Sequence, residues 1–102
     1  MTPSFVPETF ERVMGCTADE LLAWLPRALP EARLQTDAAG QSNLASWPQG
    51  RLTLSWQTLP PRRIALLVIP QLAVRFTYED LSDAERYRVQ KRFDLQTHRG
   101  GG

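Results

Sequence analysis

The chain has little of the chemistry on which most enzymes and metal sites depend. Its 102 residues include one cysteine and one histidine, Cys16 and His98. A single cysteine excludes a disulfide framework and a cysteine-based zinc cluster. A lone histidine beside a run of glycines lacks a fixed position from which to activate a nucleophile. We therefore expect no metal, no cofactor and no catalytic residue, and the sequence leaves enzyme activity open without favouring it.

Long apolar runs are also missing. The longest aliphatic run covers residues 64–69, far short of the ~20 residues that a spanning helix needs. The first four residues, Met-Thr-Pro-Ser, lack the basic and apolar regions of a signal peptide. We expect a soluble, cytoplasmic protein with no membrane contact.

A strong charge of one sign is absent as well, since the net charge is +1. Residues 51–102 are the more basic half, with nine Arg or Lys against five acids. An Arg-Gly-Gly ending occurs in some RNA-binding tails, but the basic residues do not form one stripe on the helix expected near residues 82–97. Nucleic acid is therefore an unfavoured partner.

The stretch 51–78 predicts the centre of an antiparallel sheet. Leu52, Leu54 and Trp56 alternate with polar residues, the period of a strand with one buried face. Residues 64–69 are apolar on both faces and predict a central strand, and residues 72–78 alternate again. The proline pair within residues 59–63 and the Pro-Gln step at 70–71 predict the turns between these three strands.

The flanking segments predict a helix at each end of this sheet. Capping boxes begin at Thr17 and Ser82, each with Glu three residues later. The first helix should run from 18 to about 25 and kink at Pro26 into a short second turn that ends before Pro30, and the second helix should run to about 97. On that second helix Tyr87 and Leu95 lie opposite Val89 and Phe93, so either face could be buried. Short strands are expected at 9–16, with Phe10, Arg12 and Met14 on one face, and at 32–36 and 42–47.

Together these elements predict an α+β fold in one domain at residues 9–97. We expect an antiparallel sheet of about five or six strands, with the kinked N-terminal helix and the longer C-terminal helix on one face. The order resembles a reduced helix-grip fold. Residues 1–8 should be an irregular lead-in and residues 98–102 a flexible glycine tail.

Two stretches of the chain resemble a family of short uncharacterised proteins from Gram-negative bacteria. They are the segment Leu-Pro-Pro-Arg-Arg-Ile-Ala-Leu-Leu at 59–67 and the ending that combines Arg-Phe-Asp at 92–94 with Arg-Gly-Gly-Gly at 99–102. No activity comes with that resemblance. It implies a bacterial, cytosolic protein.

These features favour a small non-catalytic protein-interaction module, with a protein partner or self-association through an edge strand or the exposed face of the last helix. One alternative is a small-molecule-binding domain or minimal enzyme with a pocket between sheet and last helix. Another is a carrier that uses its Gly-Gly terminus as ubiquitin-like proteins do. The candidate binding residues are an anion site of Arg62, Arg63 and Arg75, the pocket-rim residue Trp47, and the terminal residues Arg99, Gly101 and Gly102.

Overall fold

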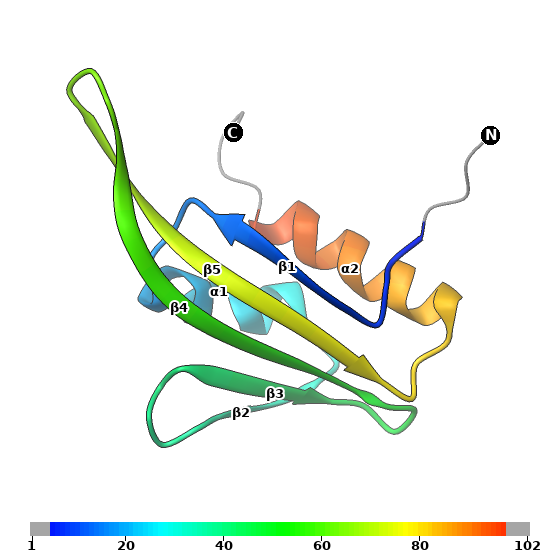
Figure 1. Cartoon of the computed structure of the whole chain (residues 1–102). Coiled ribbons are helices and arrows are strands. Elements are labelled where there is room, and N and C mark those ends of the chain that lie inside the picture. The colour runs from blue at the N-terminus through cyan, green and yellow to red at the C-terminus, as the bar shows by residue number, and fades with distance from the viewer. Residues whose placement is uncertain (1–4, 98–102) are drawn as a thin grey trace.

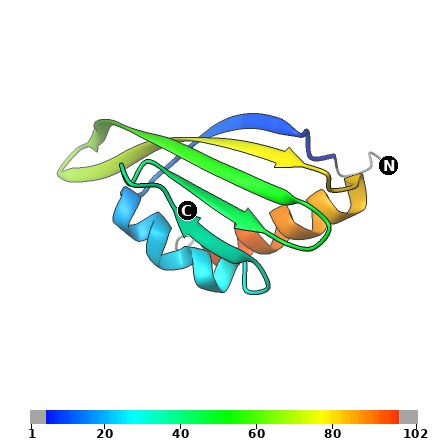
Figure 2. The same ribbon diagram turned by 90° about the horizontal axis from the view of Figure 1, so that it is seen from below.

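The computed structural model of the protein describes residues 5–97. In that range the strands form one antiparallel sheet in the order β1-β5-β4-β3-β2. Two helices in the described range, α1 and α2, lie on the same face of the sheet (Figures 1 and 2). This confirms the α+β class, with a shorter N-terminal and a longer C-terminal helix. The elements are β1 (Thr9–Met14), α1 (Ala18–Ala28), β2 (Arg33–Thr36), β3 (Ser42–Ser46), β4 (Arg51–Ile64), β5 (Leu67–Glu79) and α2 (Asp83–Thr97).

The core lies between the sheet and the two helices. Alternation along β4 and β5 aligns Leu54 with Phe76 and Trp56 with Val74, so their side chains share the helix-facing side. Leu21 and Leu25 of α1 and Phe93 of α2 are fully buried against them. Burying this apolar surface supplies the main free energy of folding.

Both helices begin where their capping boxes predict. The Thr17 hydroxyl accepts a hydrogen bond from the Glu20 amide, and the Glu20 carboxylate accepts one from the Thr17 amide. Ser82 and Glu85 repeat the arrangement before α2. α1 runs as one helix through Pro26 to Ala28 and so ends before Pro30, as expected. Packing of its buried face stabilises the helix although Pro26 has no backbone amide to donate.

The expectation of three strands between residues 51 and 78 is wrong. β4 continues through Pro60 and Pro61, with a register shift between Leu59 and Arg62, and the chain turns at Ala65, whose φ is 52°. Residues 64–69 therefore form the end of a long hairpin and not a central strand. Figure 1 shows this hairpin extending well past the neighbouring strands.

Pro60 and Pro61 are tolerated in β4 because neither β1 nor β3 extends far enough to pair with this part of the hairpin. Within residues 5–97, β1 pairs with β5 no farther than Met14 with Leu72, and β3 pairs with β4 no farther than Ser42 with Ser55. Proline is compatible with such free edges. We refer to the two-stranded projection at residues 59–71 as the arm.

No helix in the described part of the chain is long and apolar enough to cross a membrane.

Candidate functional site

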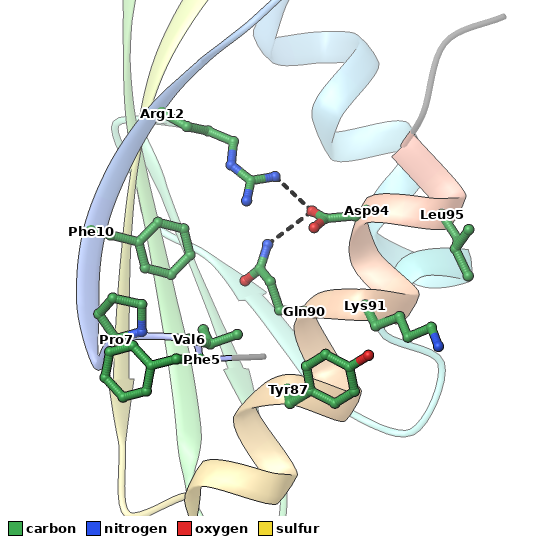
Figure 3. Close-up of a pocket in the computed structure, with 10 residues that line it drawn as sticks. All are labelled: Phe5, Val6, Pro7, Phe10, Arg12, Tyr87, Gln90, Lys91, Asp94 and Leu95. Carbon is green, nitrogen blue, oxygen red and sulfur yellow. Dashed lines mark hydrogen bonds and ion pairs between the residues drawn. The ribbon is translucent and has the colours of Figure 1, made fainter. Parts of the chain in front are cut away.

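An open groove of about 720 Å³ lies between β1, α2 and the segment that precedes β1 (Figure 3). Most of its walls are apolar, and a few charged and amide groups line its floor. Its lining residues are Phe5, Val6, Pro7, Phe10, Arg12, Tyr87, Gln90, Lys91, Asp94 and Leu95.

The position of β1 at the border of the sheet opens this groove. In the described range β1 pairs with β5 on one side and with no strand on the other. Its register aligns Phe10 with Phe76 and Arg12 with Val74, which directs the Phe10 and Arg12 side chains toward α2. The Phe10 and Phe76 rings stack at 4.7 Å, and the Arg12 guanidinium lies 5.3 Å from the Phe76 ring centroid.

The free edge of β1 presents backbone groups for pairing. Tyr78 donates its amide to the Glu8 carbonyl at 2.6 Å. Because residues of an antiparallel strand direct their backbone groups alternately toward and away from the neighbour, the amides and carbonyls of Thr9, Glu11 and Val13 point away from β5. The groove thus runs beside a row of donors and acceptors.

A polar chain crosses the groove floor. Arg12 Nη1 lies 2.6 Å from Asp94 Oδ1, which also accepts a hydrogen bond from Gln90 Nε2 at 3.0 Å. The Tyr78 hydroxyl, beneath the groove, donates to Gln90 Oε1 at 2.7 Å. Burial, together with the nearby Asp94 carboxylate, raises the pKa of Tyr78. Tyr78 therefore remains a neutral donor that fixes the Gln90 amide.

The outer wall of the groove is one face of α2. Tyr87, Lys91 and Leu95 follow at intervals of four residues and so form one stripe. Leu95 is 68% exposed, whereas Phe93 is fully buried against the sheet. The structure thereby decides which of the two faces left open by the sequence is buried.

A buried arginine fixes the end of the groove. Arg86 is 7% exposed. Its Nε donates to the Val6 carbonyl at 2.9 Å and its Nη1 to the Leu81 carbonyl at 2.7 Å, while Nη2 bonds the Asp83 carboxylate. These contacts attach the segment before β1 to the start of α2.

The groove offers apolar walls and a few polar side chains for binding. Its lining residues include no serine, cysteine or histidine that could act as a nucleophile or its base. No group of three or more His, Cys, Asp or Glu residues that could hold a metal ion occurs among residues 5–97. Its carboxylate, Asp94, is already engaged by a cation and an amide.

The residues expected to form an anion site are not brought together. Arg62 pairs in register with Ile69, six residues before Arg75 on β5, a separation of roughly 20 Å along the strand. Arg75 lies on the opposite face of the sheet from the helices, with its Nη1 3.5 Å from Glu11 Oε2. Arg62 and Arg63 lie on the arm, so the three arginines do not form one site.

Trp47 lines a second, smaller pocket of about 540 Å³, away from the groove. That pocket lies between the end of α1 and α2, where Arg88 and Arg92 are its cationic residues. The remaining candidates, Arg99, Gly101 and Gly102, lie outside the described residues, as does His98. The carrier hypothesis that depends on them stays a prediction.

Sequence reasoning allowed for a pocket between the sheet and the last helix but did not identify the residues of the groove, because its two walls come from opposite ends of the chain. Phe10 and Arg12 were assigned correctly to one face of a strand, and Tyr87 and Leu95 to one face of a helix. Their juxtaposition follows only from the strand order. No family model matches the sequence, and no curated protein matches it either, so the function is argued from the geometry.

Proposed function

We propose that this domain is a protein-interaction module that binds an extended segment of its partner in the groove by strand addition to β1. The observation that carries the proposal is the coincidence of a free strand edge with an apolar groove of about 720 Å³ beside it. In strand addition, main-chain hydrogen bonds supply affinity and pockets for alternate side chains supply specificity.

The groove sets the chemistry of the segment. A strand paired with Thr9, Glu11 and Val13 places every second side chain on the α2 side of the sheet. Those side chains would lie between Phe10 and Leu95, and we therefore expect bulky apolar residues at alternate positions.

Charge along the groove adds a preference. Lys91 is exposed on the outer wall, with its Nζ 5.7 Å from the Tyr87 ring centroid. Arg12 contributes a second cation, and Asp94 offsets one of the two. An acidic residue next to the apolar ones would complement the excess positive charge.

The volume of the groove supports a second candidate, a small apolar ligand with a polar end. Small-molecule sites typically enclose ~300–1,000 Å³ with apolar walls and a few polar groups, and the groove lies in that range. Arg12 and Gln90 would hold the polar end of such a ligand. This candidate needs the side-chain walls but not the outward backbone groups of β1.

Two matched pairs of variants test these alternatives. Val13→Pro removes an outward amide at an edge where proline is tolerated, and Val13→Ala retains it. Leu95→Glu places a charge in the apolar wall, and Gln96→Glu places one next to it on α2. The probe is a displayed library of short random peptides selected on the full chain, with affinities of enriched peptides measured by titration.

We expect enriched peptides with alternating apolar residues. Val13→Pro and Leu95→Glu should each weaken them by roughly tenfold or more, about 1.4 kcal/mol, and the two control variants should not. A small-molecule site would instead show thermal shifts with amphipathic carboxylic acids that Leu95→Glu abolishes and Val13→Pro preserves. Enriched peptides that bind all four variants equally would overturn the groove as the site.

A further inference from the structure

The end of the arm carries a group of solvent-exposed apolar side chains. Every residue from Pro60 to Val68 is exposed. Leu66 at the turn is 99% exposed, Leu67 62%, Val68 54% and Ile64 43%. An isolated two-stranded hairpin is marginally stable in water, and a contiguous apolar surface at its end marks an interaction site.

The charge on the arm itself is of one sign. The sequence from residue 38 to residue 78 contains no Asp or Glu, and its four basic residues include Arg62 and Arg63 of the arm. Neither of these arginines forms an ion pair with any residue between Phe5 and Thr97. The acids Glu79 and Asp80 lie at the opposite end of the β4–β5 hairpin, where both are paired with Arg51. The arm thus carries two positive charges and no negative one.

We propose that the arm docks on an anionic lipid surface, with the Ile64–Val68 turn inserted and Arg62 and Arg63 at the level of the lipid phosphates. Interfacial anchors enter ~5–10 Å into the boundary of headgroups and acyl chains. Ile64 pairs with Leu67 at the base of the turn, and Arg63 with Val68 behind them. Because strand residues advance about 3.3 Å each, Arg63 and Arg62 lie roughly 3 and 7 Å behind the Ile64–Leu67 pair. Aliphatic side chains therefore reach the acyl boundary just as the guanidinium groups reach the phosphates.

Several features favour a lipid surface over a second copy of the chain. Pro60, Pro61 and Pro70 remove backbone donors from both edges of the arm, which disfavours pairing with another strand. The apolar side chains surround a projecting end and do not line a concave surface. Arg62 and Arg63 attract phosphate but would repel the same arginines of a second arm.

This inference revises the expectation of no membrane contact, which was based on the length that a spanning segment needs. A hairpin end requires only a few apolar residues and contacts one leaflet. It also places the arm and the groove in separate roles, since no lining residue of the groove belongs to the arm.

Vesicle co-sedimentation of the full chain tests the proposal. The probes are vesicles of phosphatidylcholine alone and of phosphatidylcholine with one third phosphatidylglycerol, at about 0.1 M and about 1 M salt, where the Debye length is ~10 Å and ~3 Å. We expect binding to the anionic vesicles at low salt, with a loss of roughly tenfold or more at high salt or without the anionic lipid.

Three double variants locate the contact. Leu66→Glu/Leu67→Glu and Arg62→Gln/Arg63→Gln should each reduce the bound fraction by roughly tenfold. Arg27→Gln/Arg33→Gln removes the same charge from exposed positions away from the arm and should bind as the wild type does. All substituted residues are exposed, and circular dichroism of each variant verifies its fold.

Three results would overturn the proposal. The first is failure of the wild type to bind anionic vesicles. The second is an equal loss of binding in the Arg27/Arg33 and Arg62/Arg63 variants, which would indicate attraction by net charge alone. The third is a dimer, measured by light scattering without lipid, that Leu66→Glu/Leu67→Glu converts to a monomer, because a second copy would then cover the arm. None of these results bears on peptide binding in the groove.

Discussion

At the scale of single residues, Gly50 shows how closely the turn between β3 and β4 approaches the end of β5. It ends the turn that joins β3 to β4, where the amide of Trp47 donates to its carbonyl at 2.8 Å. A Cβ at Gly50 would lie 2.8 Å from the carbonyl carbon of Asp80 and closer still to the Glu79 carbonyl oxygen. Backbone atoms cannot rotate aside as a side chain can, so this position requires glycine.

We expect Gly50→Ala to lower the free energy of unfolding by about 1–3 kcal/mol, the usual cost of overpacking. Urea denaturation of the variant measures the change. Gly15→Ala is the control, because a Cβ there would meet Ile69 at an ordinary 3.5 Å. Equal stability of the two variants would contradict the close approach at Gly50.

At the scale of elements, Arg86 connects three segments through one side chain. It binds the carbonyls of Val6 and Leu81 and the carboxylate of Asp83. Arg86→Met preserves most of the side-chain volume but leaves two carbonyls without this donor. We expect a loss of about 1–3 kcal/mol and faster hydrogen exchange in the segment before β1. Arg88→Met, on the exposed side of α2, should change neither quantity, and similar exchange in both variants would refute this role for Arg86.

The elements also show where local signals suffice. The capping boxes at Thr17 and Ser82 were predicted correctly because each is complete within four residues. The arm was not predicted, because the sequence was interpreted as turning at Pro60 and Pro61. Proline interrupts a strand only where a neighbouring strand would need the missing amide as a hydrogen-bond donor. Whether that neighbour exists depends on how far β3 extends.

At the scale of the whole molecule, two carboxylates link stability to pH. Asp37 accepts the amides of Ser42 and Gln41 at 2.9 and 2.8 Å, and Glu85 accepts the Ser82 amide at 3.0 Å. These backbone hydrogen bonds lower the pKa of Asp37 and of Glu85 from the ordinary 3.8 and 4.5. A lowered folded-state pKa stabilises the fold above the unfolded value, and the stabilisation is lost as pH falls.

We therefore expect the melting temperature to be nearly constant above about pH 5 and to fall as the pH drops below about 4.5. Asp37→Asn/Glu85→Gln should be less stable than the wild type at neutral pH and should lose less on acidification. Calorimetry across this range measures both slopes. The same acid-induced loss in wild type and double variant would show that other carboxylates carry the effect.

The groove marks the limit of what sequence reasoning reached. Alternation correctly placed Phe10 and Arg12 on one face, and angular spacing correctly separated Tyr87 and Leu95 from Phe93. Each of these signals is internal to one element. Neither indicates that a strand near the N-terminus pairs with β5 and lies next to α2, which is a long-range choice made by the packing of the sheet.

The sequence by itself determined the α+β class, the helix starts and most strand positions, because periodicity and capping act within a few residues. The tertiary structure decided which strand forms the border of the sheet, which face of α2 is exposed and how far β4 and β5 extend beyond their neighbours. Those three outcomes create the groove and the arm. They depend on which segments pack against each other over long distances in the sequence, and local sequence patterns do not specify those contacts.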